Sequence, residues 1–117
     1  MVALAKVMSL QPKILMLDEP TKGLDANTKL VFAGILQSLR EQGVSILVVT
    51  HDAEFACTVA DRCALCFQGE ICGTDETRKF FSENSFYTTT VNRITRGYFK
   101  DCVTLEDAAY ALGLQIK

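Results

Sequence analysis

Two adjacent carboxylates, Asp18 and Glu19, stand at the end of an apolar run and directly before Pro20. Acids in this order suit phosphoryl transfer, because one carboxylate can hold Mg²⁺ while the next orients or deprotonates a water molecule. A second polar pair, His51 and Asp52, also directly follows an apolar run. These residue types indicate a site that handles phosphate and is assembled from two separate parts of the chain.

The runs before these residues, Ile14–Asp18 and Ile46–Thr50, have the character of strands buried on both faces of a parallel sheet, since their apolar residues do not alternate with polar ones. Between them, the apolar spacing predicts a helix over 26–42, capped by Asp25 and closed by Gly43. Strand, helix and strand at this spacing predict a parallel pair with a right-handed crossover. Both polar pairs should therefore emerge at the same edge of the sheet.

The remaining sequence predicts short helices and one hairpin. Short helices are expected over 2–9, 53–61 and 76–82, and strands over 62–67 and 70–73 flank the turn Gln68-Gly69. From residue 84 the chain changes character, and a capping-box pattern at Thr104–Asp107 predicts a helix over 105–112. We therefore expect an α/β part over 1–83 and a helical carboxyl-terminal extension over 84–117.

Composition narrows the functional classes. The 117 residues suffice for one small domain, and the net charge of −2 with a pI near 5.3 gives no support for binding nucleic acid. No apolar run approaches the roughly 18 residues of a membrane span, and the amino terminus lacks the pattern of a secretion signal. The five cysteines are an odd number, so reduced thiols and a cytoplasmic location are expected.

Four stretches of the sequence resemble, in order and spacing, the motifs of ABC-type ATPases. Ile14–Asp18 is similar to the Walker B strand, and Glu19 to the catalytic glutamate that follows it. Gly23-Leu24-Asp25 is similar to the D-loop, and Thr50-His51-Asp52 to the switch-histidine region. The agreement extends over residues 2–73. The resemblance implies an α/β fold that is part of a P-loop NTPase domain of the ABC type.

The carboxyl-terminal tail resembles one subgroup of this family, and two of the family's motifs are missing from the sequence. Phe86-Tyr87-Thr88-Thr89 and Asn92-Arg93-Ile94 resemble the ATPase subunits of energy-coupling-factor importers of the cobalt and vitamin type. None of the seven glycines is followed by lysine, so the phosphate loop of such ATPases is missing, as is the Leu-Ser-Gly-Gly-Gln signature. In the family the signature lies just before the segment that Val2 begins. We therefore expect the carboxyl-terminal half of a nucleotide-binding domain, inactive by itself.

The resemblance also implies a role for each site residue. Asp18 would hold the Mg²⁺ of the nucleotide, usually through a water, and Glu19 would polarise the attacking water. His51 would donate a hydrogen bond to the γ-phosphate, and Asp25 would act across a dimer interface. Structural roles compete with each of these: a strand-end acid at Asp18, a solvated acid at Glu19, a structural histidine at His51 and a plain helix cap at Asp25.

For the parent protein, the resemblance implies an ATPase that uses ATP and Mg²⁺ to drive import of a solute, a vitamin or a metal. Its partners would be a second ATPase domain and a transmembrane coupling subunit, which would hold it at the inner face of the membrane, and no nucleic acid is expected. This chain by itself is expected to bind neither cofactor. The alternative is a non-catalytic dimerisation or regulatory fragment, while a DNA-repair ATPase is disfavoured by the acidic pI.

Four further patterns also carry expectations. Exposed strand edges and an uncovered apolar face on the two parallel strands predict that the chain forms a homo-oligomer. Cysteines could bind zinc, although small apolar fillers in the hairpin are the favoured interpretation. These cysteines are Cys57, Cys63, Cys66 and Cys72. An aromatic group is expected to be core rather than a partner surface, and it consists of Phe80, Phe81, Phe86 and Tyr87. Arg93 and Arg96 could meet an acidic partner, although a solvated helix face is the favoured interpretation.

Overall fold

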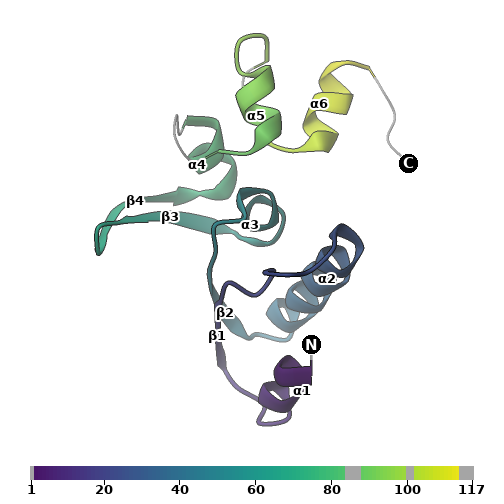
Figure 1. Cartoon of the computed structure of the whole chain (residues 1–117), viewed down its shortest axis with the longest axis vertical. Coiled ribbons are helices and arrows are strands. Elements are labelled where there is room, and N and C mark those ends of the chain that lie inside the picture. The colour runs from purple at the N-terminus through teal and green to yellow at the C-terminus, as the bar shows by residue number, and fades with distance from the viewer. Residues whose placement is uncertain (1, 84–87, 100–101, 114–117) are drawn as a thin grey trace. The chain divides into compact units, whose positions relative to one another are not determined.

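The computed structural model describes residues 2–83, 88–99 and 102–113 (Figure 1). The chain divides into two compact units, Met1–His51 and Asp52–Lys117, and each is described by itself. The first contains one parallel pair of strands and two helices, and the second contains an antiparallel pair and four helices within the described residues. This confirms the predicted mixed α/β class. The expected boundary between residues 83 and 84 stays a prediction.

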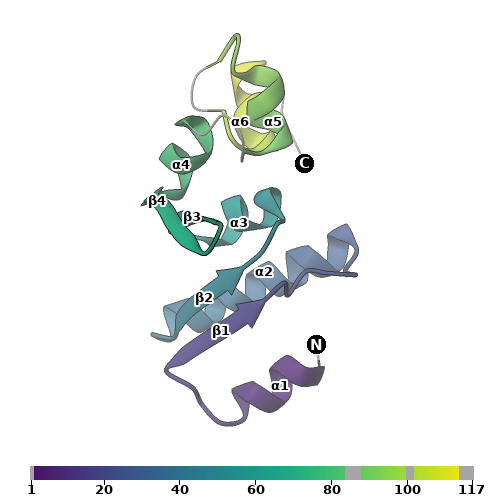
Figure 2. The same ribbon diagram turned by 60° about the vertical axis from the view of Figure 1, so that its left-hand side comes forward.

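The first unit is the predicted strand–helix–strand arrangement, preceded by helix α1 (Val2–Met8). Strand β1 (Ile14–Asp18) pairs in parallel with β2 (Ser45–Val49), and helix α2 (Ala26–Glu41) connects them. Figure 2 shows α2 running alongside the two strands, whose arrows point the same way. The carboxyl ends of β1 and β2 therefore lie at one edge of the pair, as the sequence predicts.

Burial in β1 and β2 alternates, which contradicts the prediction that both faces are covered. Leu15 is buried, and the buried residues of α2 are Phe32, Leu36 and Leu39. On the opposite face Met16 is 71% exposed and its register partner Leu47 is 53% exposed. The predicted uncovered apolar face is thus present within the described residues of this unit, where α2 packs on the face that carries Leu15.

The ends of α2 follow from local sequence. The Asp25 carboxylate accepts a hydrogen bond of 2.7 Å from the main-chain N–H of Thr28, which satisfies one of the free amides of the first helical turn. At the other end Gly43 has a φ of 89°, a left-handed conformation that glycine adopts without strain. The predicted start and both end signals are confirmed, and the helix ends at Glu41, one residue before the predicted end.

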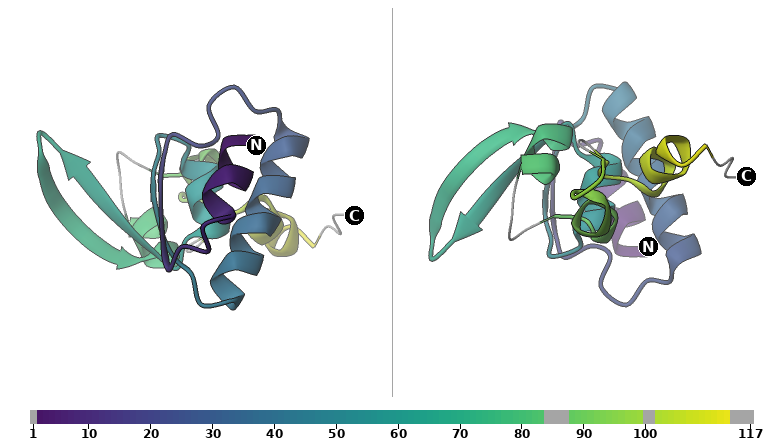
Figure 3. Two further views of the ribbon diagram at one scale, coloured as in Figure 1. Left: turned by 90° about the horizontal axis from the view of Figure 1, so that it is seen from below. Right: turned by 90° about the horizontal axis from the view of Figure 1, so that it is seen from above.

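The second unit begins with α3 (Ala53–Val59) and a hairpin of β3 (Arg62–Phe67) and β4 (Glu70–Glu76). Gln68 and Gly69 both have positive φ, 51° and 81°, as expected for the tight turn of a two-residue hairpin. Figure 3 shows the two strands as a long, curved ribbon. The predicted hairpin is confirmed, and β4 extends three residues further than expected.

The hairpin contains a bulge that changes the interpretation of its cysteines. Leu65 pairs with Gly73 and Cys66 pairs with Ile71, so Cys72 is the extra residue. Cys66 and Cys72 are exposed thiols rather than the expected apolar fillers. Cys57 is half-buried, and this burial is the main factor that raises the pKa of its thiol to about 11. Within the described residues, no group of three or more His, Cys, Asp or Glu side chains could hold a metal ion.

Three further helices complete the described part of this unit: α4 (Thr77–Glu83), α5 (Thr90–Thr95) and α6 (Leu105–Ala111). Phe81 is buried and Phe80 contacts it edge-on, with ring centroids 5.1 Å apart, so these two aromatic residues pack together as expected. Phe86 and Tyr87 lie outside the described residues. No helix in the described ranges has both the length and the apolar character needed to cross a bilayer.

Buried polar groups hold α5 in place. The Asn92 side chain is among the most buried in the unit, and its Nδ2 donates to the carbonyl of Cys102 at 2.8 Å. Thr88 donates to Asn92 Oδ1 at 3.0 Å and also to the carbonyl of Phe81, while Thr89 donates to the carbonyl of Val103 at 2.6 Å. The Thr-Thr-x-x-Asn segment thus connects α4, α5 and the segment before α6.

Helix α6 is fixed at its first turn by the predicted capping box. Thr104 accepts from the N–H of Asp107, and Asp107 accepts from the N–H of Thr104. Arg78 of α4 adds two hydrogen bonds to the same carboxylate, at 3.0 and 3.1 Å. The Asp107 carboxylate therefore joins α4 to α6 and completes the cap of α6.

Asp107 makes the second unit sensitive to acid. Burial alone would raise its pKa, but hydrogen bonds from Arg78 and from the N–H groups of Val103 and Thr104 lower the pKa to about 2. Because the folded-state pKa is depressed, this stabilisation is complete above the ordinary pKa near 3.8 and is lost as the pH falls towards 2. We expect roughly 1–2 kcal/mol of unfolding free energy to depend on this carboxylate.

Urea unfolding between pH 5 and about 2.5 measures how the free energy of unfolding depends on pH. In this range the Asp107 carboxylate becomes protonated more readily in the unfolded chain than in the folded one. Asp107→Asn should remove most of the loss of unfolding free energy at low pH. Glu106 is an exposed acid in the same turn, and Glu106→Gln should leave that loss unchanged. A curve for Asp107→Asn that parallels the unsubstituted chain would contradict this role.

Candidate functional site

The candidate site lies at the carboxyl edge of β1 and β2. Asp18 is the last residue of β1, and its register partner is Val49 of β2. The ladder continues one step further, because the N–H of Glu19 donates to the carbonyl of Val49 at 2.7 Å. Glu19 then adopts a φ of 46°, a left-handed conformation that is uncommon for a non-glycine residue. Backbone conformations of this kind are frequent at functional sites.

The Glu19 carboxylate faces the two residues that follow β2. Its Oε1 accepts from the main-chain N–H of His51 at 3.1 Å, and its Oε2 accepts from the hydroxyl of Thr50 at 3.3 Å. The His51 ring nitrogen Nε2 lies 3.5 Å from Oε1. The side chain of Glu19 is 32% exposed and that of His51 is 95% exposed. The structure therefore brings Glu19 and His51 together, with the imidazole open to solvent.

Asp18 and Asp25 have different surroundings. Asp18 is exposed at the strand end, adjacent in sequence to Glu19. Asp25 is committed to capping α2, and hydrogen bonds from Thr28 lower the pKa of its carboxyl. Capping and a role at an interface are compatible, since the carboxylate of Asp25 is itself exposed. Asp52, the neighbour of His51, caps α3 by accepting from the N–H of Phe55 at 3.0 Å.

The donor chemistry of this edge fits Mg²⁺ delivered with a nucleotide. Mg²⁺ is bound through one or two carboxylates together with substrate phosphates and retained waters, and does not need a cage made only of protein groups. The exposed carboxylate of Asp18 could supply one such oxygen ligand. Glu19 is less suited, because its two oxygens already accept hydrogen bonds from Thr50 and His51.

Sequence reasoning missed two donors at this site, the hydroxyl of Thr50 and the N–H of His51. Thr50 directly precedes the predicted histidine. Threonine is common in β-strands, however, so its position at the end of one does not indicate a further role. The contact with Glu19 depends on the left-handed turn after β1, which apolar patterning does not reveal.

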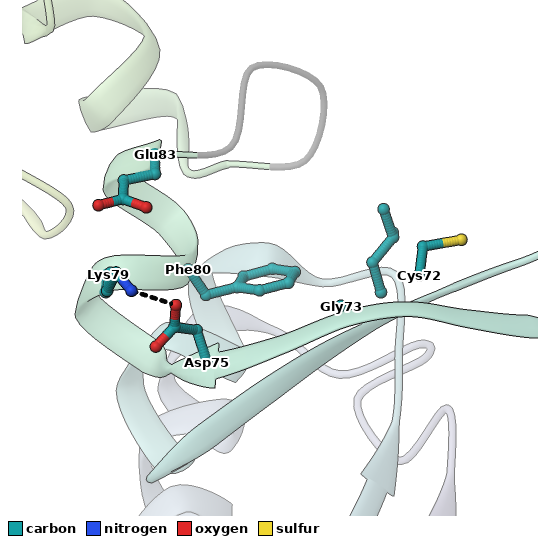
Figure 4. A pocket seen from close by; sticks show the side chains of 7 residues that line it. Cys72, Gly73, Asp75, Lys79, Phe80 and Glu83 are labelled. Carbon is teal, nitrogen blue, oxygen red and sulfur yellow. Dashed lines mark ion pairs between the residues drawn. The ribbon is translucent and has the colours of Figure 1, made fainter.

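A separate pocket lies in the second unit, between the hairpin and α4. Figure 4 shows Lys79 and Asp75 pointing toward one another, with Phe80 beside the strand that carries Cys72. The Lys79 Nζ to Asp75 Oδ2 distance is 2.8 Å, and this ion pair lowers the pKa of Asp75 and raises that of Lys79. Because Asp75 lies on β4 and Lys79 on α4, this ion pair joins the hairpin to the helix across the pocket, and the two charges neutralise each other.

The sequence of this chain is similar to those of several known proteins. A protein of Bacillus thuringiensis with the provisional name ABC transporter ATP-binding protein is 39% identical over 107 residues, which cover 92% of this chain and 19% of that protein. The glutamine transport ATP-binding protein GlnQ of Geobacillus stearothermophilus is 38% identical over 81 residues, covering 69% of this chain and 34% of that protein. The chain spans about a fifth of the length of the first of these relatives.

The fold comparison gives the same result. The structure of cbiO1 from Clostridium perfringens, described as part of the ABC transporter complex cbiONQ, matches with a TM-score of 0.60. That match has 24% sequence identity and covers 97% of this chain and 41% of the solved chain. No family profile matches the sequence. The predicted ABC-type fold is confirmed by this match.

Proposed function

We infer that this chain, which matches a segment of the ABC transporter ATP-binding proteins, carries the residues that act on the terminal phosphate during ATP hydrolysis. Glu19 is the general base, His51 is the contact to the γ-phosphate, Asp18 holds Mg²⁺ and Asp25 acts across a dimer interface. Residues 1–83 contribute to the nucleotide-binding domain, and residues 84–117 form its extension. ATP with Mg²⁺ supplies the electrophilic phosphoryl group when bound.

The single observation that carries this proposal is the contact between Glu19 and the two residues after β2. A general base must remain ionised and must keep a lone pair free for its water. A carboxylate has about four lone-pair positions, and donors on one side leave the other side available. The exposed imidazole of His51 lies beside the base, and its ring N–H could donate a hydrogen bond to a phosphate bound at this edge.

A chimera tests the proposal. The 107-residue matching segment of the Bacillus thuringiensis relative is replaced by the corresponding residues of this chain, so that the rest of the domain is supplied. We expect the chimera to bind and hydrolyse ATP at a rate comparable with the unmodified relative, measured by phosphate release. An active relative with an inactive but folded chimera would contradict the proposal.

The isolated chain is expected to show neither ATP binding nor turnover above background. Backbone N–H groups and a lysine normally cradle the phosphates in this class of site, and the sequence contains no Gly-x-x-x-x-Gly-Lys-[Ser/Thr] pattern. Isothermal titration of the purified chain with Mg-ATP measures this directly. Rapid hydrolysis by the chain alone would contradict this expectation and would show that ATP is hydrolysed at a different site.

For the parent protein we propose solute import, with a vitamin or metal as cargo, driven by two ATPase domains on a transmembrane coupling subunit. This places the protein at the inner face of the membrane through its partners. The names of two similar proteins support the proposal, one a glutamine transport ATP-binding protein and the other part of an ABC transporter complex.

The uncovered apolar face favours a second candidate role, in which this chain is a dimerising fragment. Met16 and Leu47 are directly opposite each other on that face, and both are exposed. Large exposed apolar patches favour association. We predict that the purified chain is a homodimer or a higher oligomer in light scattering.

Substituting Met16→Lys together with Leu47→Glu should convert the oligomer to a monomer, because the pair removes the apolar contact while opposite charges across the strands preserve the sheet. Leu30→Lys with Val31→Glu, two exposed positions on α2, is the matched control and should leave the oligomer intact. A monodisperse monomer before any substitution would contradict the prediction.

A further inference from the structure

We propose that Thr50 is a positioning residue for Glu19, whose hydroxyl fixes the orientation of the carboxylate that acts as the general base. The inference deepens the proposed function and rests on it for its catalytic meaning. The contact itself lies wholly within the first unit of the chain, so it can be tested without measuring activity.

The geometry assigns a distinct task to each donor. The N–H of His51 reaches both carboxylate oxygens, at 3.1 Å to Oε1 and 3.4 Å to Oε2. By itself this donor allows the carboxylate to rotate, since either oxygen can accept its hydrogen. The hydroxyl of Thr50 donates to Oε2 at 3.3 Å and adds a second contact at a different point of the carboxylate. Together the two donors define one orientation of the carboxylate plane.

The backbone explains why these donors face Glu19. Thr50 directly follows β2, and the N–H of Glu19 is bound to the carbonyl of Val49, one residue before Thr50. That ladder bond brings the two strand ends together, and the φ of 46° at Glu19 turns the chain away from the strand path. Thr50 is half-buried, so its hydroxyl is partly shielded from competing water.

The orientation matters because a base acts only when its free lone pair is aimed at the water. A misplacement of about 1 Å in a reacting group can lower a rate by about 10²-fold. Losing one hydrogen bond to a charged group corresponds to about a tenfold change in an equilibrium. We therefore expect Thr50→Val, which keeps the shape but removes the hydroxyl, to lower kcat about tenfold and leave the KM for ATP unchanged.

The first test uses the 117-residue chain and needs no activity. His51 is the only histidine, so its resonances are readily identified, and the exchange rate of its main-chain amide reports the bond to Glu19. Thr50→Val should raise that exchange rate about tenfold. Without the Thr50 hydroxyl, the Glu19 carboxylate is less firmly oriented and accepts less well from the His51 amide. Thr50→Ser restores a hydroxyl and should stay within about twofold of the unsubstituted rate. Glu19→Ala gives the unprotected limit.

The second test uses the chimera and a double-mutant comparison. If Thr50 acts through Glu19, then Thr50→Val should cause no further loss of turnover once Glu19 is replaced by Gln, whereas a purely structural role would add its own loss. Unchanged amide exchange and unchanged kcat in Thr50→Val would overturn the inference and leave the proposed function standing. Full activity of Glu19→Gln would instead overturn the proposed function, while the amide-exchange result would still decide the orientation of the carboxylate.

Discussion

Glu19→Gln in the chimera is expected to lower ATP turnover by at least about a hundredfold, while nucleotide binding is retained. General bases contribute about 10²- to 10⁴-fold to rate, and an amide cannot accept the proton of the attacking water. The substitution keeps the size of the side chain and an oxygen that can still accept from Thr50 and the His51 amide. The loss should therefore appear in kcat rather than in the KM for ATP.

The matched control for this prediction is Glu41→Gln, which replaces an exposed acid on α2 in the same unit. It should change turnover by less than about twofold, since surface substitutions away from a site have small effects. Phosphate release measured with saturating Mg-ATP gives kcat for all three proteins. If Glu19→Gln retained more than half of the activity, Glu19 could not be the general base.

Asn92→Ala is expected to destabilise the second unit by about 3 kcal/mol, because three partners lose a buried hydrogen-bonding group at once. The side-chain Nδ2 donates to the carbonyl of Cys102, and Oδ1 accepts from Thr88 and from Arg96. The alanine would leave the carbonyl of Cys102 buried without this donor and would also open a small cavity. The loss should loosen α5 together with the segment that leads to α6.

Urea unfolding followed by circular dichroism measures this loss, and hydrogen exchange of the amides in α5 and α6 locates it. Asn27→Ala is the control, because Asn27 is an exposed asparagine in the first turn of α2. An Asn92→Ala chain whose stability lies within about 0.5 kcal/mol of the control would show that the network contributes little.

Local elements of this fold could be predicted because their signals lie within a few residues. The bounds of β1 were predicted as observed, and β2 begins and ends one residue earlier than expected. The caps at Asp25 and Thr104 follow from side chains that reach a main-chain amide three residues away. The hairpin turn follows from Gln68-Gly69, where a positive φ is readily adopted by glycine.

Burial of the strands could not be predicted in the same way. An apolar residue such as Met16 or Ile14 shows that a face can be covered but not whether another element covers it. In the structure α2 packs against one face only, so β1 and β2 alternate between buried and exposed positions. The same limit applies to Asn92, whose polar side chain gives no local sign that it is buried against the carbonyl of Cys102.

The site was predictable as far as topology determines it. Parallel strands place their carboxyl ends at one edge, so Glu19 and His51 could be expected together before any contact was known. The hydrogen bonds from Thr50 and the His51 amide depend on the left-handed turn at Glu19, which no residue pattern in the strand specifies. The catalytic roles of Asp18, Glu19, Asp25 and His51 stay predictions.

A crystal structure of the Glu19→Gln chimera with Mg-ATP tests the central claim most directly. We predict that His51 Nε2 lies within hydrogen-bonding distance of a γ-phosphate oxygen, that residue 19 contacts a water in line with that phosphate, and that Asp18 lies beside Mg²⁺. A nucleotide whose γ-phosphate is bound elsewhere, with His51 and residue 19 in contact only with each other, would contradict the account.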